Sequence, residues 1–316
     1  MNEEDSIKAY LASNYLVQPD KVSYINEGVT NTNYLVETSD GKYLFKIYNF
    51  KSEDQVQFEV NVLEELRRHD FPSPKVISRK DKLNIGVYKK KPSLLYVYID
   101  GGVNKDWDGF MIKKVGKYMG KKHSLLKDFP DRSKSHTFDI DETKKLVREG
   151  RSRFAEASFP EYESLLSFVE KNLTGLSLSN DLPKGVTHHD IKHENVILND
   201  KEIAGIIDFD LSYYGVLIND IATTIIWECF DGDEMNMEKA QSFIDGYEEE
   251  RPLTSVEKDN LCETIHFRLV REVFSSPFDV LPNYIEITKP RSDEFRRRAE
   301  RFQDAKANIR FSFKGD

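Results

Sequence analysis

Asp190, Asn195 and Asp208 have the side-chain types and the spacing that phosphoryl transfer requires. The stretch 187–210 reads THHDIKHENVILNDKEIAGIIDFD, so Asn195 follows Asp190 by five positions, and two apolar runs separated by a turn lead to Asp208. A carboxylate can orient an attacking hydroxyl and accept its proton, because the alcohol loses that proton late in a loose transition state. An amide and a second carboxylate offer the hard oxygen ligands that Mg2+ takes alongside those of a triphosphate. This spacing predicts Asp190 as the catalytic base and Asn195 and Asp208 as magnesium ligands.

Two other metal-dependent chemistries compete for the same stretch. His189 and His193 stand four positions apart, and on a helix this spacing would place both on one face, where they could bind zinc. Histidine–aspartate pairs also occur in helical metal-dependent phosphohydrolases. The residues that follow, VILND at 196–200, predict a strand and a turn rather than a helix. The zinc and phosphohydrolase interpretations therefore fit less well than phosphoryl transfer.

A lysine and a glutamate in the first third of the chain could complete a nucleotide site. Lys46 lies in KYLFKIYNF (42–50), where alternating apolar residues predict a strand. Glu59 lies in a predicted helix at 52–69, which Ser52 can cap. In kinases such a lysine holds the phosphates of ATP and pairs with such a glutamate. Each residue alone has an ordinary explanation as a surface charge, but the ordered set of Lys, Glu, Asp, Asn and Asp favours a kinase.

Two further segments are expected to contact the nucleotide. The turn EGVTNTN at 27–33 could cover the phosphates with backbone N–H groups and polar side chains. The adenine is expected at 94–99, through backbone hydrogen bonds. No GxxxxGK[ST] loop occurs, which excludes a P-loop kinase. The predicted nucleotide-contacting residues of these segments are Asn31, Thr32, Asn33, Tyr96 and Val97.

The pattern along the chain predicts an α+β fold of two lobes. The first ninety or so residues alternate like the strands of an antiparallel sheet, with the helix at 52–69 laid on it. Beyond the turn DGG at 100–102 the pattern becomes mostly helical. The polar connector at 127–140 has no period and is expected to be a mobile loop; whether it closes over a substrate stays open. The predicted parts are a sheet lobe at 1–93, a hinge at 94–100 and a helical lobe at 101–316, with helices near 106–126, 141–154, 160–173, 219–230, 236–249, 255–275 and 292–306.

The composition narrows the class of protein further. The net charge of −9 argues against a nucleic-acid partner, which would select a basic face. Cys229 and Cys262 form no metal-type spacing and are expected to be idle thiols in a reducing compartment. We find no signal peptide and no apolar run long enough to span a membrane. The expected location is therefore the cytoplasm, and the sequence does not indicate an oligomeric state.

Taken together, these segments resemble the aminoglycoside phosphotransferase superfamily, the protein-kinase-like group that phosphorylates small alcohols. GVTNTNYLV resembles its nucleotide hairpin, FEVNVLEELR its glutamate helix, HHDIKHENVIL its catalytic loop and IIDFD its magnesium motif. His188 stands at the first histidine of the loop. NDIATT resembles a helix start in which Asp220 would brace the catalytic loop through backbone hydrogen bonds. The resemblance implies a two-lobed kinase fold that uses ATP and Mg2+. Protein kinases fit less well, because the glycine-rich loop and the DFG glycine are missing.

Within this superfamily the tail of the chain resembles the homoserine kinase branch. The similar segments are GYEEERPLTSVEKDNL, FRLVRE and ITKPRSDEFRRR. The resemblance implies an amino acid hydroxyl as the acceptor, whose carboxylate would need a guanidinium and whose ammonium group would need an acid. The pair Ile226–Trp227 departs from the polar residues of that branch. Trp227 is expected in the core, with a place in the lining of the acceptor pocket as the alternative. The residues expected at the acceptor are Asp210, Glu228, Asp231, Arg268 and Arg271.

Other functions stay open beside phosphorylation of homoserine. Aminoglycosides, amino sugars and choline-like amino alcohols are acceptors of the same chemical class of reaction. The two arginines could instead form an ordinary ion pair between helices. A nucleotide-binding module that regulates partners without turnover is an alternative of another class. The complete set of catalytic residues favours an enzyme over such a module.

Overall fold

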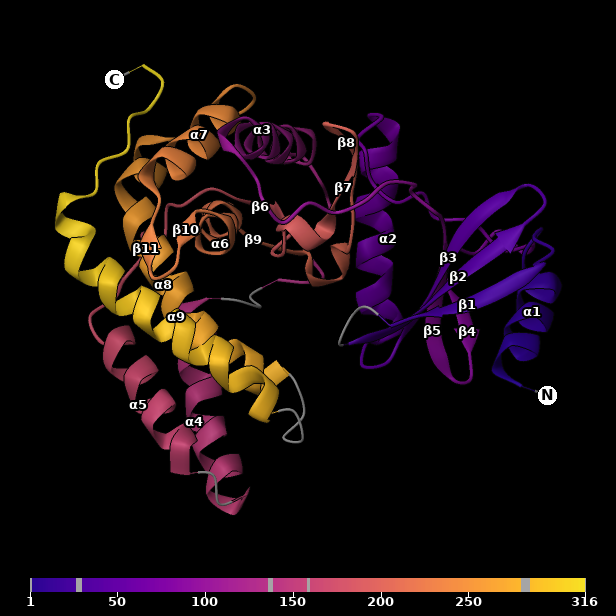
Figure 1. Cartoon of the computed structure of the whole chain (residues 1–316), viewed down its shortest axis with the longest axis horizontal. Helices are drawn as coiled ribbons and strands as arrows, with labels where there is room; N and C mark the ends of the chain where they lie inside the picture. The colour runs from indigo at the N-terminus through magenta and orange to yellow at the C-terminus, as the bar shows by residue number, and fades with distance from the viewer. Residues whose placement is uncertain (1, 27–29, 136–138, 158–159, 280–284, 316) are drawn as a thin grey trace. The chain divides into compact units, whose positions relative to one another are not determined.

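The computed structural model describes residues 2–26, 30–135, 139–157, 160–279 and 285–315. The chain divides into two compact units, which are drawn in Figure 1. Unit 1 contains residues 1–104 and 194–210, and unit 2 contains residues 105–193 and 211–316.

The boundary of unit 1 differs from the hinge expected at 94–100. Unit 1 continues to residue 104 and includes the later segment 194–210. Backbone hydrogen bonds explain this inclusion: Gly102 and Leu198 exchange two of them, at 2.9 and 2.8 Å, and the Ile206 N–H donates to the carbonyl oxygen of Pro72 at 2.8 Å. A segment far along the chain is therefore part of the unit that carries Lys46.

The predicted antiparallel sheet of unit 1 is confirmed. It has five strands in the order β1-β2-β3-β5-β4, and all neighbours are antiparallel. The register places Lys46 of β3 opposite Asn33 of β2 and Leu94 of β5, so Lys46 lies on the central strand. The strands are β1 (Lys21–Ile25), β2 (Asn31–Thr38), β3 (Gly41–Tyr48), β4 (Gly86–Tyr88) and β5 (Lys91–Val97).

Two helices pack with this sheet. α2 (Glu53–Arg68) is the predicted helix, and Ser52 and Gln55 form a capping box at its start. α1 (Glu3–Asn14) was not expected from the sequence, which shows little amphipathic periodicity there. The apolar side chains of Ile7 and Leu11 nevertheless share one buried cluster with strand residues such as Phe45.

A β-hairpin completes unit 1. It consists of β7 (Val196–Asn199) and β8 (Glu202–Ile206), which pair in antiparallel fashion from Val196 opposite Ile206. This is the strand, turn and strand that the sequence predicts between Asn195 and Asp208. The hairpin fixes the positions of both residues, because one precedes it and the other follows it.

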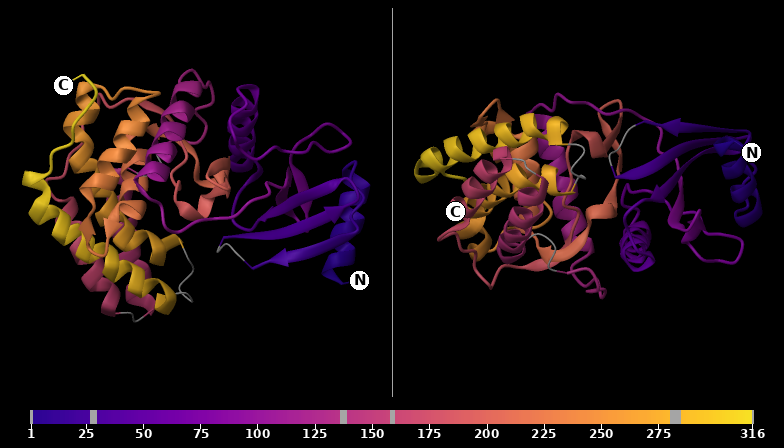
Figure 2. Two further views of the ribbon diagram at one scale, coloured as in Figure 1. Left: turned by 45° about the horizontal axis from the view of Figure 1, so that its top comes forward. Right: turned by 90° about the horizontal axis from the view of Figure 1, so that it is seen from below.

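Unit 2 is mainly helical, as predicted. α9, yellow in Figure 2, packs along α8, and α4 packs against α5. Short strand pairs connect the helices: β6 (Lys184–Thr187) with β9 (Tyr213–Val216), and β10 (Phe230–Asp231) with β11 (Glu234–Met235). The helices are α3 (Gly109–Leu125), α4 (Ile140–Ala157), α5 (Pro160–Leu173), α6 (Ile218–Glu228), α7 (Met237–Glu248), α8 (Ser255–Asp279) and α9 (Ile285–Ala305).

Glycines allow α3 and α7 to approach closely. A Cβ atom on Gly116 of α3 would lie 2.1 Å from the carbonyl oxygen of Phe243, and one on Gly246 of α7 would lie 1.9 Å from that of Lys113. Side chains at these positions would therefore force the helices apart. The close contact brings the last turns of α3 and α7 together, where His123 and Tyr247 meet.

The connector at 127–140 is ordered by β9 in the part that the structure describes. The Tyr214 N–H donates to the Lys134 carbonyl oxygen at 2.7 Å, and the Arg132 guanidinium lies 3.7 Å from the centroid of the Tyr214 ring. Residues 136–138 are outside the described part. Among the described residues, no helix has both the length and the apolar character to span a membrane.

Candidate active site

Asn195 and Asp208 lie at the same end of the β7–β8 hairpin. Asn195 immediately precedes β7, and Asp208 follows β8 by two positions. The Ile207 N–H donates to the Asn195 carbonyl oxygen at 2.9 Å, which continues the ladder beyond the strands. Asp208 has a φ of 64°, a left-handed conformation that costs free energy for a residue with a side chain and often marks a functional position.

The donors of this hairpin suit magnesium better than zinc. No group of three or more His, Cys, Asp or Glu side chains that could hold a metal occurs among the described residues. An amide oxygen and a carboxylate are hard donors, and Mg2+ typically takes only one or two protein ligands while triphosphate oxygens and water supply the others. Asn195 and Asp208 therefore fit the predicted ion.

Lys46 is buried and contacts the carboxylates that follow β8. Its Nζ lies 2.7 Å from Oδ1 of Asp208 and 3.8 Å from Oδ2 of Asp210. Burial lowers the pKa of Lys46, but the carboxylates of Asp208, Asp210 and Glu59 outweigh this effect and hold that pKa well above its usual value. Lys46 is therefore a fixed positive charge beside a proposed magnesium ligand.

Glu59 does not form the ion pair with Lys46 that the sequence predicts. Its two carboxylate oxygens accept hydrogen bonds from the hydroxyls of Tyr48, at 2.9 Å, and Tyr96, at 2.8 Å. Burial raises the pKa of Glu59, although Lys46 acts in the opposite direction. The expected pair is replaced because Asp208 lies closer to Lys46, and because two phenol groups satisfy the Glu59 carboxylate.

Asp210 also differs from the expectation that it contacts an acceptor. Its side chain is buried and accepts a hydrogen bond of 2.7 Å from the Asn31 amide, while Lys51 lies at 3.3 Å. Burial would raise the pKa of Asp210, but Lys46 and Lys51 lower it below its usual range. Asp210 therefore organises the cations of unit 1, and Lys51, which follows β3, is a residue that the sequence analysis missed.

The other residues that were predicted to contact the nucleotide have partners within unit 1. The Thr32 hydroxyl lies 3.5 Å from the Asn49 amide oxygen, and Asn33 lies opposite Lys46 in the ladder. The Tyr96 hydroxyl is bound to Glu59, and the Val97 N–H donates to the Lys75 carbonyl oxygen at 2.9 Å. That N–H is therefore used within unit 1, and adenine binding through the backbone of 94–99 stays a prediction. The beginning of the predicted phosphate turn, 27–29, lies outside the described residues.

Asp190 belongs to unit 2, in the loop after β6. Its carboxylate Oδ1 lies 3.2 Å from Nζ of Lys192, and its N–H donates to Nδ1 of His188 at 3.3 Å. The preceding residue, His189, has a φ of 72°, so the loop contains a second left-handed residue. Lys192 was missed by the sequence analysis, although its position two residues after Asp190 could have identified it.

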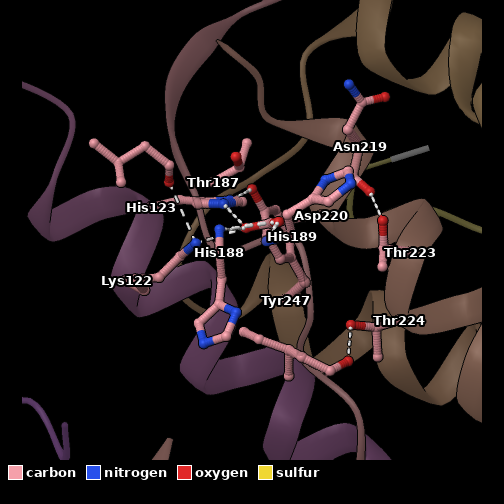
Figure 3. Close-up of polar contacts among 12 residues, drawn as sticks. Lys122, His123, Thr187, His188, His189, Asn219, Asp220, Thr223, Thr224 and Tyr247 are labelled. Carbon is pink, nitrogen blue, oxygen red and sulfur yellow. Dashed lines mark hydrogen bonds and ion pairs between the residues drawn. The ribbon is translucent and has the colours of Figure 1, made fainter. Parts of the chain in front are cut away.

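Asp220 holds this loop through its backbone, as the resemblance implies. Its carboxylate, near the start of α6, accepts from the N–H of His188 at 2.8 and 3.0 Å and from the N–H of His189 at 2.6 Å. Lys122 and His123 of α3 contact the same carboxylate (Figure 3). The Thr224 hydroxyl adds a hydrogen bond of 2.8 Å to the Ile191 carbonyl oxygen. The loop is therefore fixed on both sides of Asp190.

The predicted acceptor arginines are buried around one glutamate. Arg268 pairs with Glu272 at 2.8 Å, and Arg271 lies 4.0 Å from the same oxygen of Glu272. Burial and Arg271 lower the pKa of Arg268 to about 10, although Glu272 opposes this. Burial, followed by Arg268 and Arg271, lowers the pKa of His189 well below its usual value. The two arginines therefore lie close enough to the loop around Asp190 to affect its charges. Their contacts with Glu272 are ion pairs within one helix, α8, rather than between helices.

Trp227 is half-buried rather than part of the core, contrary to the expectation. The Lys192 Nζ lies 5.0 Å and the Arg291 guanidinium 4.2 Å from the centroid of its ring. The Phe295 ring packs with it in a T-shaped arrangement, with the ring centroids 4.8 Å apart. Because Lys192 also contacts Asp190, Trp227 belongs to the surroundings of the Asp190 carboxylate. Arg291 was another omission, since its distance along the chain gives no signal of this contact.

The two acids expected to bind an ammonium group have different surroundings. Glu228 is buried and accepts from the N–H and Nδ1 of His193, at 2.9 and 3.0 Å. Asp231 is exposed in the β10–β11 hairpin and accepts from Asn236 at 2.7 Å. Glu228 therefore holds the loop through His193. A contact with an acceptor would follow only from its position beside this loop. The described contacts of Asp231 are instead with Asn236 and Lys239, near its own hairpin.

The fold is that of a protein-kinase-like phosphotransferase. The chain belongs to the phosphotransferase enzyme family known as APH, whose family model matches residues 21–253. Homoserine kinase of Brucella ovis is 27% identical over 261 residues, which cover 81% of this chain and 78% of that enzyme.

Solved structures with the same fold come from several kinases. An amicoumacin kinase, determined with AMP-PNP and Ca2+, has a TM-score of 0.71 at 20% identity and covers 99% of this chain and 96% of its own. A microcompartment-associated aminopropanol kinase has a TM-score of 0.68 at 15% identity, covering 96% and 98%. The choline kinase LicA of Streptococcus pneumoniae has a TM-score of 0.63 at 16% identity, covering 96% and 99%. These identities support the common fold and leave the acceptor open.

Proposed function

We propose that this chain is a magnesium- and ATP-dependent kinase that phosphorylates a hydroxyl group of a small molecule. The observation that carries the proposal is the placement of Asn195 and Asp208 at one end of the β7–β8 hairpin, with Lys46 at 2.7 Å from Asp208. These are the side chains that bind magnesium and phosphates in kinases. Complexes with AMP-PNP and with ADP among solved kinases of this fold are consistent with ATP as the nucleotide here.

The residues of unit 1 would bind and orient the nucleotide. Asn195 and Asp208 would hold Mg2+, which when bound neutralises charge on the β- and γ-phosphates. Lys46 would exchange its contact with Asp208 for the phosphates, and its raised pKa keeps it positively charged for both partners. Glu59 acts indirectly, because it fixes Tyr48 and Tyr96 beside Lys46 rather than pairing with the lysine.

Asp190 would orient the acceptor hydroxyl and receive its proton. The acceptor oxygen forms a bond to the γ-phosphorus while the bond from this phosphorus to the bridging oxygen of ADP breaks, and the hydroxyl proton passes to the carboxylate. The ammonium of Lys192 at 3.2 Å favours the ionised carboxylate before the reaction. The bonds of Asp220 and Thr224 to the loop keep Asp190 in place.

Homoserine is the first candidate for the acceptor. Homoserine kinase of Brucella ovis is 27% identical to this chain, and the charges of unit 2 are consistent with a carboxylate. Arg268, Arg271 and Arg291 gather around Glu272 at 2.8, 4.0 and 3.9 Å, and a group of guanidinium groups of this kind could bind a carboxylate. Arg291 also keeps 41% of its side chain exposed, which leaves it available to a ligand. Such a site disfavours polycationic aminoglycosides.

The experiment is magnesium-dependent ADP release with a matched panel of acceptors. L-homoserine is compared with aminopropanol, which lacks the carboxylate, with γ-hydroxybutyrate, which lacks the amine, and with choline and kanamycin. We expect turnover with homoserine and a much weaker response without the carboxylate. Asp190→Asn should lower kcat by about 10²–10⁴-fold while nucleotide binding persists. Turnover with choline or kanamycin alone would overturn the acceptor assignment and retain the kinase.

Arg291 offers a test of how the acceptor is recognised. Arg291→Gln should raise KM for the carboxylate-bearing acceptor by about 10-fold or more, because a charged hydrogen bond contributes about 1.5–3 kcal/mol. Arg297→Gln is the matched control, since Arg297 lies on the same helix and pairs with Asp233 at 2.9 Å. An equal KM for both variants would exclude Arg291 from the acceptor site. Nucleotide binding without ADP release for any acceptor would favour a regulatory module instead.

A further inference from the structure

Unit 2 contains a buried lysine next to the histidine that contacts Asp220. Lys122 is fully buried, and its Nζ donates to Oδ2 of Asp220 at 2.6 Å and to the Val186 carbonyl oxygen at 3.2 Å. His123, also buried, lies with Nε2 at 3.0 Å from the same Asp220 oxygen. Figure 3 shows both side chains converging on Asp220 from α3. A lysine is rarely buried unless it is paired, so its place at this carboxylate calls for a role.

The neighbours of His123 determine which of its nitrogens carries the proton. Asp220 can only accept, so Nε2 of His123 must donate to it. Nδ1 of the neutral ring then accepts from the Tyr247 hydroxyl at 2.8 Å, and the oxygen of that hydroxyl accepts from Arg251 at 2.8 Å. Glu257 in turn pairs with Arg251 at 2.9 Å. A chain of hydrogen bonds with one direction thus runs from Arg251 to Asp220.

The charges balance only while His123 is neutral. Arg251 is matched by Glu257, and Lys122 is matched by Asp220. A proton on His123 would add an uncompensated buried charge and would remove the acceptor that Tyr247 uses. Without Lys122, by contrast, Asp220 would be a buried anion whose nearest available source of positive charge is His123.

We propose that Lys122 is a positioning residue of the catalytic loop: its charge keeps Asp220 ionised and His123 neutral, so that the carboxylate accepts the N–H groups of His188 and His189. The tautomer of His123 and the conformation of the loop are thereby set by a lysine on another helix. The catalytic consequence rests on the proposed kinase function, whereas the state of His123 does not.

The titration behaviour of these groups is consistent with the geometry. Burial and then Lys122 lower the pKa of His123 to about 3, while Asp220 on α6 acts in the opposite direction and Arg251, beyond α7, adds a smaller decrease. Burial also lowers the pKa of Lys122, against the effect of Asp220. Asp220 keeps a pKa well below its usual range despite burial, with Lys122 the largest stabilising partner. Tyr247 is the remaining titratable group that faces His123.

The direct test measures His123 by nitrogen NMR in the full-length protein. In the wild type we expect the neutral Nε2–H form of His123 from pH 8 to about pH 5.5, with the signal assigned by its loss in His123→Asn. In Lys122→Met we expect His123 to titrate within that range, since the opposing charge is gone and Asp220 remains. Lys121→Met, the neighbouring lysine on α3, should leave the signal unchanged. A neutral, non-titrating His123 in Lys122→Met would overturn the proposal.

A second variant covers the case in which Lys122→Met does not fold. Tyr247→Phe removes the hydroxyl that donates to Nδ1 of His123 and leaves Lys122 in place. We expect His123 to stay neutral in this variant, because the charge rather than the phenol determines its state. Titration of His123 between pH 5.5 and 8 in Tyr247→Phe would assign the effect to Tyr247 and refute the role of Lys122.

Turnover supplies the functional readout. With an acceptor from the panel, Lys122→Met should lower kcat by about 10–100-fold at pH 8, as expected for a misplaced catalytic group, with KM for ATP unchanged. Part of the loss should be recovered at pH 6, where a proton on His123 replaces the missing charge. The same loss at both pH values would contradict the proposal. If the wild type shows no turnover, the kinase function fails, and the NMR experiment still decides the state of His123.

Discussion

Each unit contains a buried lysine that contacts carboxylates, and the two lysines differ in the direction of their pKa shifts. Lys46 of unit 1 lies against Asp208 and Asp210, and its pKa is raised because these carboxylates outweigh burial. Lys122 of unit 2 lies against Asp220, and its pKa is lowered because burial outweighs a single partner. Two ion pairs of similar length, 2.7 and 2.6 Å, thus go with lysine pKa values that are shifted in opposite directions.

The partners explain the difference. Asp208 keeps 40% of its side chain exposed and Asp220 only 1%, so Asp208 can be solvated if Lys46 changes partner, whereas Asp220 cannot. Around Lys46, the two carboxylates of Asp208 and Asp210 exceed the single positive charge of the lysine, which suits a site that receives a cation with its nucleotide. The charges of Lys122 and Asp220 cancel each other, which suits a pair that supports the backbone. Of these two lysines, we therefore expect only Lys46 to exchange its carboxylate partner for another ligand.

The stability of the protein should distinguish the two lysines most strongly. Lys122→Met should lower the free energy of unfolding by about 3–5 kcal/mol, the cost of leaving a buried charge without its partner. Lys46→Met should cost less, because Asp208 reaches solvent and Asp210 keeps Lys51. Urea denaturation at pH 7 measures both values. A larger loss for Lys46→Met would refute the assignment of Lys122 as the structural lysine.

Nucleotide affinity should show the reverse order. Lys46→Met should weaken binding of magnesium–ATP by about 10–100-fold, since charged hydrogen bonds contribute about 1.5–3 kcal/mol. Lys122→Met should change this affinity less than about twofold, because the hydrogen bonds of Lys122 within the described part of the chain go to Asp220 and Val186. Isothermal titration calorimetry measures both variants under the same conditions. Equal affinities for the wild type and Lys46→Met would remove Lys46 from the nucleotide site.

The local parts of this comparison could be predicted from the sequence. The spacing from Asn195 to Asp208 predicts a hairpin, and a hairpin brings its two ends together whatever surrounds it. Local sequence patterns also predicted the helix α2 and the strand that contains Lys46. The contacts of Asp220 with the loop followed from the resemblance and are present in the structure.

The contacts that depend on packing could not be predicted. Lys122 is 98 positions from Asp220 in the sequence. The pattern of residues along α3 does not indicate that the Lys122 side chain is buried. The same reason applies to Tyr96 beside Glu59, where a predicted lysine partner was wrong. Trp227 was expected in the core, yet it is half-buried, with Lys192 and Arg291 over its ring.

Acid should destabilise unit 2 before unit 1. Burial lowers the pKa of His123 to about 3 and that of His266 to about 4, while an unfolded histidine titrates near about 6.5. Between these values the unfolded state binds the proton and the folded state does not. The stability of unit 2 therefore falls as the pH drops below about 6.5, by about 1.4 kcal/mol per pH unit for each histidine.

Unit 1 should respond only at lower pH. The pKa of Asp210 is lowered below 3.8, so its stabilisation is present above that pH and is lost only as the pH falls further. Hydrogen exchange at pH 7 and 5, corrected for intrinsic rates, should show lower protection of α3 and α6 at pH 5 and little change in β2 and β3. His266→Gln should reduce the effect in unit 2. Equal losses in both units would contradict the assigned histidines.

The smallest expected effect compares two threonine hydrogen bonds, one from α6 to the loop of Asp190 and one within α6. Thr224 and Thr223 are both buried on α6 and both appear in Figure 3. The Thr224 hydroxyl donates to the Ile191 carbonyl oxygen of the loop, whereas the Thr223 hydroxyl donates to the carbonyl oxygen of Asn219 on its own helix. Thr224→Val should therefore cost about 1 kcal/mol of stability, the net contribution of a hydrogen bond, and should also lower kcat.

Thr223→Val is the matched control for this experiment. It removes a hydroxyl of the same kind from the same helix, but α6 keeps its backbone bonds and the loop loses nothing, so kcat should stay at the wild-type value. Urea denaturation and initial rates with saturating ATP compare the two variants. A fall in kcat for Thr223→Val as large as that for Thr224→Val would mean that turnover depends on the packing of α6 itself. The tie to Ile191 would then have no separate part in holding Asp190.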